Sequence, residues 1–211
     1  LEHSSTISVE CSLPELSDEH NLVYEAANLL REHTNYPEGV RIHVEKNIPV
    51  SAGLGGGSSN AAYTLMALNT LYNLRLNKKE LCILANKIGS DVPFFIKGGI
   101  KKILGTGHII EDTHSEVIRN KIFLLVVPKF SISTHWAYGE IKKHLHKNKI
   151  KPKFPPLTDG VDWTLFENDF EHVVCSAYPE ILDIKSTMYE NGALYSGLSG
   201  SGSTMFGIYN K

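Results

Sequence analysis

Residues 49–60 read PVSAGLGGGSSN, a stretch rich in glycine and serine. It follows an alternating, strand-like run at residues 40–44 (VRIHV) and enters a helical pattern that carries Ala61, Leu65, Leu68 and Tyr72 on one face. Glycines let the backbone approach a ligand closely, and the start of a helix presents unpaired amide groups and the positive end of its dipole. The order of strand, glycine loop and helix therefore predicts a phosphate-binding loop.

This loop differs from the two commonest phosphate-binding motifs. A Walker A loop ends in Gly-Lys-Ser/Thr, and no lysine lies between Lys46 and Lys78. The dinucleotide fingerprint needs a third small residue at a fixed step, which the glycines here do not provide. The hydroxyls of Ser58 and Ser59 can add hydrogen-bond donors or a ligand for Mg²⁺, and we expect the helix to begin directly after them, near Asn60. A flexible glycine linker is the alternative, which the direct entry into an alanine-rich helix disfavours.

The composition is that of an ordinary globular protein with nearly balanced charge. The 211 residues are 42% apolar, and 21 Lys and Arg stand against 23 Asp and Glu. No overall field attracts nucleic acid or an anionic membrane, so neither is expected as a partner. Three cysteines without CxxC spacing indicate neither a disulfide framework nor a zinc site. The longest nearly apolar run, residues 122–128, is too short to span a membrane, and the start lacks a signal-peptide pattern, so we expect a cytoplasmic protein.

The first half of the chain alternates strand and helix patterns. A strand is expected at residues 6–10, followed by a helix that Ser17 or Asp18 caps. Asn77 is expected to cap a further helix that stops at Gly89. These patterns predict an α+β protein.

The second half has a different pattern, which predicts a second small domain. The polar stretch at residues 111–120 separates two apolar runs, so we expect domains at residues 1–120 and 121–211. Residues 162–178 have a helical pattern, and residues 193–209 hold a second glycine-serine segment between strands. That segment could line the same anion site as the first loop, or it could be a simple hairpin turn.

Asp91 is the strongest candidate for chemistry outside the glycine loops. It follows the end of a helix and precedes Val92-Pro93, and the proline is expected to keep Val92 extended and so to fix where the carboxylate points. Alone, an aspartate after Gly-Ser is more often a turn residue. Beside a phosphate loop, it can orient a hydroxyl nucleophile and accept its proton, as phosphoryl transfer requires.

Several spaced segments together resemble the GHMP kinases. The second and third signature motifs of that family are similar to PVSAGLGGGSS at residues 49–59, IGSDVPFF at residues 88–95 and LSGSGSTMF at residues 198–206. DEHNLVYEAANLL at residues 18–30 and NDFEHVV at residues 168–174 point to the branch that phosphorylates 4-diphosphocytidyl-2-C-methyl-D-erythritol. The resemblance covers nearly the whole chain, and the segments agree in order.

The resemblance implies a fold, an activity and a cofactor. The fold would combine an N-terminal strand-helix domain that binds ATP with a smaller, ferredoxin-like C-terminal domain. The activity would be transfer of the ATP γ-phosphate to a hydroxyl of the cytidine diphosphate methylerythritol substrate, in the non-mevalonate isoprenoid pathway. Mg²⁺ would arrive with ATP, and the protein would be a monomer or a homodimer.

The resemblance also implies roles for individual residues. Asp91 would be the catalytic base, and Ser58 would bind Mg²⁺. Tyr138 would stack on cytosine through its aromatic face, with ordinary helix packing as the alternative for this residue and for Trp136. Substrate contacts are expected from Thr134, Tyr138, Gly200 and Ser201. Asn21 and Lys46 would lie near the nucleoside of ATP. The triphosphate would be wrapped by Pro49, Val50, Ser51, Ala52, Gly53, Leu54, Gly55, Gly56, Gly57, Ser58 and Ser59.

The sequence also departs from the family pattern. The first motif, a Pro-x-Lys-Ile-Asn-Leu strand with a catalytic lysine and a following Gly-Tyr-His segment, does not occur in these 211 residues. Neither Lys46 nor Lys97 matches the position of that lysine. The chain also stops soon after the third motif, so we expect a truncated kinase with little activity on its own.

Three other functions remain open from the sequence. The chain could be a GHMP kinase for another small alcohol, such as mevalonate or homoserine. It could be an inactive fragment that binds nucleotide without transferring phosphate. It could bind nucleic acid through Lys142, Lys143, Lys147, Lys149, Lys151 and Lys153. A solvated helix end and loop explain these lysines more simply. A metal site at His144-x-His146 is not expected, because no carboxylate or cysteine set lies near it.

Overall fold

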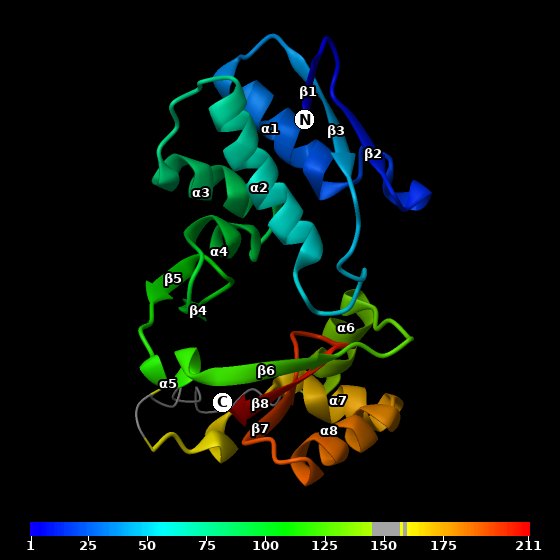
Figure 1. Ribbon diagram of the computed structural model, residues 1–211. Helices are drawn as coiled ribbons and strands as arrows, with labels where there is room; N and C mark the ends of the chain where they lie inside the picture. The colour runs from blue at the N-terminus through cyan, green and yellow to red at the C-terminus, as the bar shows by residue number, and fades with distance from the viewer. Residues whose placement is uncertain (145–156, 158–159) are drawn as a thin grey trace. The chain divides into compact units, whose positions relative to one another are not determined.

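A computed structural model describes residues 1–144, 157 and 160–211 (Figure 1). Contacts within the chain divide it into two compact units. The first comprises Leu1–Pro49 and Gly55–Thr113, and the second comprises Val50–Leu54 and His114–Lys211. The sequence placed one boundary near residue 120, whereas the contacts change at Thr113 and also assign five loop residues to the second unit.

The first unit contains two small sheets. Strands β1 (Glu2–Ser4), β3 (Gly39–Val44) and β2 (Ser8–Cys11) form one sheet in that order, with β1 antiparallel and β2 parallel to β3. Strands β4 (Lys101–Leu104) and β5 (Ile109–Asp112) form an antiparallel pair. The strand expected at residues 6–10 is β2, which begins two residues later and ends one residue later.

Four helices pack with the first sheet around one core. They are α1 (Leu22–Thr34), α2 (Gly56–Leu71), α3 (Lys78–Ile88) and α4 (Val92–Lys97), with a short 3₁₀ turn, η1, at Pro14–Leu16. Helices α1 and α2 lie side by side (Figure 1). The predicted apolar face of α2 is confirmed for Ala61, Leu65 and Leu68, which are buried in the core, whereas Tyr72 is the C-cap and is only partly buried against that core.

The helix caps show where the sequence analysis was right and where it was wrong. Asn77 caps α3 in a capping box with Glu80, and Gly89 ends that helix, as predicted. Asn21 caps α1, where Ser17 or Asp18 was expected. Those two side chains are engaged in the preceding turn: the Ser17 hydroxyl accepts a hydrogen bond from the Cys11 amide (2.8 Å), and the Asp18 carboxylate accepts one from the amide two residues later (3.0 Å).

The second unit is an antiparallel sheet with helices on it. Strands β6 (Lys121–Val126), β8 (Met205–Asn210) and β7 (Tyr195–Leu198) pair in that order. Helices α7 (Asp169–Ala177) and α8 (Glu180–Glu190) lie along one face of the sheet (Figure 1). Helix α6 (Thr134–His144) packs on α7, and α5 (Glu116–Arg119) is a single turn before β6.

The helical pattern of residues 162–178 is only partly helix. Residues Trp163–Leu165 form a 3₁₀ turn, η2, and α7 begins at Asp169. Asp162 and Asn168 both cap a following segment, so the side chains that favour caps divide the stretch in two. None of the described helices has the length and apolar character that crossing a bilayer requires. Lys147, Lys149, Lys151, Lys153, the His144 side chain and His146 lie outside the residues that the structure describes.

Candidate active site

The second half of the glycine loop is the first turn of α2. Gly55 is the N-cap in the left-handed region (φ 64°), and no side chain caps the helix. The first helical hydrogen bond runs from the Ser59 amide to the Gly55 carbonyl (2.8 Å). The amides of Gly56, Gly57 and Ser58 therefore have no partner within the helix, and they point outward from the positive end of its dipole. The helix was expected to begin near Asn60, but it begins at Gly56, because Gly56, Gly57 and Ser58 themselves form its first turn.

A lysine lies beside this turn. A Cβ on Gly56 would lie 2.9 Å from the Lys46 ammonium nitrogen and 3.0 Å from a methyl group of Ile48. Glycine therefore lets the Lys46 side chain reach the backbone at the start of α2. A cation at a helix N-terminus is unfavourable by itself, since both carry positive charge. The two together make a local site for an anion such as a phosphate group.

Helix α4 supports the loop from the other side and carries Asp91 at its start. A Cβ on Gly55 would lie 2.8 Å from the ring of Phe95, so that ring packs directly on the turn. Asp91 is exposed and occupies the N-cap position of α4 without capping it, and its carboxylate accepts a hydrogen bond from the Ser90 hydroxyl (3.4 Å). Its oxygens are thus available to a ligand.

The residue after Asp91 corrects one prediction. Val92 was expected to be extended because Pro93 follows it, but Val92 is the first residue of α4. A proline in the first turn of a helix loses no hydrogen bond, since the amides there have no helical partner. Val92 is also completely buried, so packing of its side chain favours the helical start over the local preference.

The first half of the glycine loop contacts the loop that joins β7 to β8. The Thr204 amide donates to the Ala52 carbonyl (3.1 Å), and the Ser199 hydroxyl donates to the Gly53 carbonyl (2.8 Å). Gly53 has a φ of +74°, and a Cβ there would overlap the Ser199 carbonyl oxygen. The two backbones therefore meet at a position where glycine is required. The second glycine-serine segment is a hairpin connection, and it also contacts the first half of the glycine loop.

Three of the four predicted substrate residues meet in the same loop region. The Thr134 hydroxyl, at the start of α6, is 3.2 Å from the Ser201 hydroxyl. Gly200 precedes Ser201 and adopts a φ of +57°. Its carbonyl accepts a hydrogen bond from the Asn168 side chain (2.8 Å). Ser201 is buried, with 7% of its surface exposed.

Tyr138 lies one helical turn after Thr134 and differs from its neighbour Trp136. The Trp136 ring packs edge-on against Tyr178 (5.7 Å) at the edge of the second core, so ordinary packing explains it. Tyr138 is 54% exposed and touches the Phe170 ring edge-on (4.9 Å). Its surface is therefore available for stacking with an aromatic ligand.

Asn21 has a structural role that the sequence analysis assigned to its neighbours. Its side-chain oxygen accepts a hydrogen bond from the Val23 amide (3.0 Å), and its nitrogen donates to the Leu16 carbonyl (2.8 Å). The expected contact between Asn21 and the ATP nucleoside stays a prediction.

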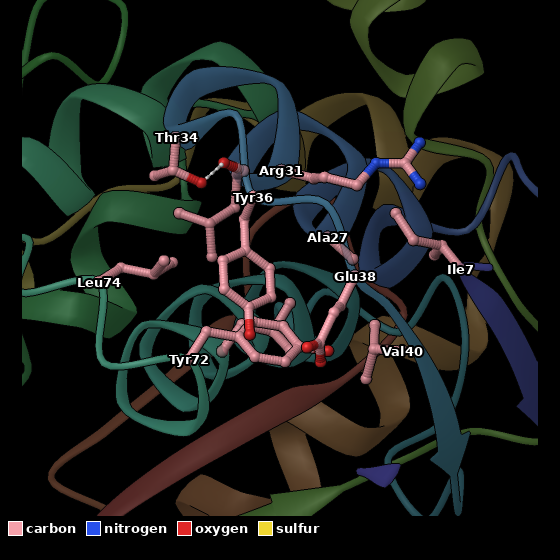
Figure 2. A pocket seen from close by; sticks show the side chains of 11 residues that line it. Ile7, Ala27, Arg31, Thr34, Tyr36, Glu38, Val40, Tyr72 and Leu74 are labelled. Atoms are coloured by element: carbon pink, nitrogen blue, oxygen red, sulfur yellow. Dashed lines mark hydrogen bonds between the residues drawn. The ribbon is translucent and has the colours of Figure 1, made fainter. Parts of the chain in front are cut away.

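A small cavity in the first unit is too small to be a substrate site. It lies where α1, β3 and the end of α2 meet, and the stacked rings of Tyr36 and Tyr72 (4.1 Å) form one wall (Figure 2). Its volume of about 10 Å³ has room for about one water molecule.

Among the described residues, no group of three or more His, Cys, Asp or Glu side chains is arranged to hold a metal ion.

The sequence analysis missed three residues that position these loops. Phe95, Asn168 and Ser199 all lie in segments that were singled out as motifs, but none had been given a role. Their side chains act on backbone atoms, and sequence patterns do not show which backbone atoms a side chain will reach.

The chain matches two parts of one protein family. Residues 21–99 match the family described as GHMP kinases N terminal domain, and residues 162–211 match GHMP kinases C terminal. The two matches include the phosphate loop and the β7–β8 loop, respectively.

Individual relatives agree with these matches. The chain is 39% identical to a 4-diphosphocytidyl-2-C-methyl-D-erythritol kinase of Thermodesulfovibrio yellowstonii, over 99% of this chain and 75% of the relative. It is 40% identical to one of Clostridium novyi, over 97% and 74% of the two chains. The chain thus spans about three quarters of the length of these relatives.

Solved structures show the same fold. A crystal structure of a 4-(cytidine 5'-diphospho)-2C-methyl-D-erythritol kinase matches with a TM-score of 0.73 and 30% identity, over 96% of this chain and 73% of that one. A homoserine kinase of Cytophaga hutchinsonii matches with a TM-score of 0.77 but 18% identity, over 100% and 74%, which shows likeness of fold alone. These findings confirm the predicted α+β, two-domain fold, and the chain belongs to the GHMP kinase family, in the branch of the 4-diphosphocytidyl-2-C-methyl-D-erythritol kinases.

Proposed function

We propose that this chain carries the site at which ATP phosphorylates a hydroxyl of 4-diphosphocytidyl-2-C-methyl-D-erythritol, in the non-mevalonate route to isoprenoid precursors. The observation that carries the proposal is the start of α2, which no side chain caps, whose first three amides have no partner within the helix, and where the Lys46 ammonium group lies near Gly56. This arrangement attracts a polyphosphate, and relatives near 39% identity are named as kinases of this substrate.

The residues at the start of α2 fit the triphosphate of ATP. The amides of Gly56, Gly57 and Ser58 would donate to phosphate oxygens, and Lys46 would offset their negative charge. The Ser58 hydroxyl, in the same helical turn, would bind the Mg²⁺ that arrives with ATP. The metal would neutralise charge on the phosphates, which is its general role in phosphoryl transfer.

Asp91 would act on the acceptor hydroxyl. Its carboxylate is exposed and makes no helix-cap bond, so it can accept a hydrogen bond from an incoming alcohol. As the oxygen attacks the γ-phosphorus, its proton passes to the carboxylate, and the bond between the γ-phosphorus and the β,γ-bridging oxygen breaks. The phosphoryl group then resides on the alcohol, and ADP leaves.

The second unit would recognise the substrate. The exposed Tyr138 ring offers a surface for the cytosine base, and the neighbouring hydroxyls of Thr134 and Ser201 offer hydrogen-bonding groups. Gly200, the residue before Ser201, has a φ of +57° and would contribute its backbone to the substrate contacts.

The test measures phosphoryl transfer to 4-diphosphocytidyl-2-C-methyl-D-erythritol together with ATP affinity. Asp91→Asn should lower turnover by about 10²- to 10⁴-fold, the usual contribution of a general base, and leave ATP affinity unchanged. Asp183→Asn, at an exposed aspartate of α8, is the matched control and should change neither quantity. Equal turnover in Asp91→Asn and in the unsubstituted chain would contradict the assignment of the base. ATP binding without any turnover would favour the alternative, a nucleotide-binding fragment.

A further inference from the structure

The N-cap side chain of α7 holds the loop between β7 and β8. The Asn168 side-chain nitrogen donates to the Leu198 carbonyl and to the Gly200 carbonyl, both at 2.8 Å. Its side-chain oxygen accepts from the Phe170 amide (2.9 Å), which caps α7. One asparagine thus uses both of its donor hydrogens to fix the loop and its acceptor to begin a helix.

The Glu171 carboxylate, one turn further along α7, also holds Leu198. One oxygen of Glu171 accepts a hydrogen bond from the Leu198 amide (2.8 Å), and the other pairs with the Lys185 ammonium of α8 (2.5 Å). The Glu171 side chain is only 16% exposed. A charge-assisted hydrogen bond in such a site is stronger than one in water. Side chains of α7 therefore hold both polar backbone groups of Leu198.

Leu198 is the last residue of β7 before the chain turns. It pairs with Met205 at the end of the hairpin that adjoins the connecting loop, and the Ser199 amide then donates to the Thr204 carbonyl (2.8 Å). Beyond this point the loop leaves the sheet, and ladder hydrogen bonds no longer fix its path. The α7 contacts are placed where the sheet stops controlling the backbone.

The residues directly after Leu198 hold the phosphate loop. Ser199 donates its hydroxyl to the Gly53 carbonyl, and the Thr204 amide donates to the Ala52 carbonyl. Gly53 lies two residues before Gly55, the N-cap of α2. A continuous series of contacts thus runs from α7 through Leu198 and Ser199 to the segment that precedes the anion-binding turn.

We infer that Asn168 and Glu171 are positioning residues for the triphosphate: by fixing Leu198, they set where Ser199 holds Gly53, and so the path of the phosphate loop. This inference rests on the proposed function, since it needs ATP phosphates to bind at the start of α2. Neither side chain is assigned a contact with ATP or the substrate. Their effect reaches the ligand through the backbone, where small displacements of binding groups have large effects on affinity and rate.

Asn168→Asp tests the inference while keeping the helix cap. Aspartate is as good an N-cap as asparagine, so α7 retains its first hydrogen bond, but both donations to the loop are lost. Asn77→Asp is the matched control, because Asn77 caps α3 through its side-chain oxygen in the same way. Ser199→Ala removes the next link in the series.

The first measurement needs no ligand. The Thr204 amide bonds the Ala52 carbonyl, so its hydrogen-exchange rate, followed by NMR, reports the contact between the two loops. Asn168→Asp should speed this exchange by about tenfold or more, the effect of losing one or two hydrogen bonds, and Asn77→Asp should not. An unchanged exchange rate in Asn168→Asp would overturn the inference, whether or not the chain binds ATP.

The second measurement compares the affinity for ATP with the affinity for adenosine. Asn168→Asp and Ser199→Ala should each weaken ATP binding by about tenfold and leave adenosine binding unchanged, because the loop contacts phosphates. The double variant should lose little more than either single variant, since both act through one series of contacts. Equal losses for ATP and adenosine, or fully additive losses, would overturn the inference. If the unsubstituted chain failed to bind ATP, the proposed function would be contradicted, and the exchange measurement would still decide the loop contact.

Discussion

Replacing Gly53 by alanine should separate the phosphate loop from the β7–β8 loop. The new methyl group would overlap the Ser199 carbonyl oxygen and lie 3.0 Å from the Gly202 carbonyl oxygen. Both neighbours are backbone atoms, which cannot move aside as the end of a flexible side chain can. The φ of +74° at this position adds strain for any residue with a Cβ.

The cost has two parts. An L-residue in the left-handed region costs about 1–2 kcal/mol. If the loops part, the hydrogen bonds from Ser199 to Gly53 and from Thr204 to Ala52 are also lost, at about 0.5–1.5 kcal/mol each. Gly53→Ala should therefore lower the free energy of unfolding by about 2–5 kcal/mol in total.

A substitution at a second glycine of the same unit distinguishes the cost of backbone strain from the cost of the lost hydrogen bonds. Gly192 has a φ of +86°, and a Cβ there would have no atom within 4 Å. Gly192→Ala should therefore show the strain alone, about 1–2 kcal/mol. Urea denaturation of both variants measures the difference, with ATP affinity measured in parallel, and only Gly53→Ala should weaken ATP binding. Equal losses of stability and unchanged ATP affinity would show that the two loops are not in contact in solution.

Two further predictions concern buried hydroxyls of the second unit. Burial, and then the charges near it, chiefly that of Glu171, raise the pKa of Tyr195 to about 12 from its ordinary 10.0. The folded protein keeps this proton between about pH 10 and 12 while the unfolded chain loses it, so stability should fall as pH rises through that window. Tyr195→Phe should remove this part of the alkaline loss in a denaturation series, and Tyr63→Phe, at an exposed position, should not. The Thr204 hydroxyl is fully buried and has no hydrogen-bond partner among the described residues. Thr204→Val should therefore raise the free energy of unfolding by about 1 kcal/mol, and a decrease would show that the hydroxyl has a partner in solution.

Local patterns predicted much of the fold because local physics determines those elements. The capping box at Asn77 and the stop at Gly89 need only neighbouring residues, and both were found as expected. The apolar face of α2 follows from helical spacing alone. Predictions that ignored nearby competition were wrong: Ser17 and Asp18 have other partners in their turn, and the buried side chain of Val92 outweighs the preference of a residue before proline.

The sequence indicated which segments would form the candidate site, but not how those segments are held. The glycines, the serines and the following helix pattern indicated an anion site, and the structure shows unpaired amides at the start of α2. The sequence could not show that Ser199 would hold Gly53, because 146 positions separate the two residues. A contact of that kind depends on how β7 and β8 end, which no short window of sequence contains.

The glycine loop is divided between the two units, which has a consequence for recombination and for engineering of the chain. The chain crosses between the two units after Pro49, after Leu54 and after Thr113, so no single cut separates them. A break at Thr113 would leave Val50–Leu54 on one fragment and its backbone partners, Ser199 and Thr204, on the other. Two such fragments, made as separate polypeptides, could reassemble through the hydrogen bonds of Ser199 and Thr204 to Val50–Leu54. A recombination at the same point between distant relatives would combine Val50–Leu54 of one protein with the β7–β8 loop of another. These two stretches are therefore expected to change together.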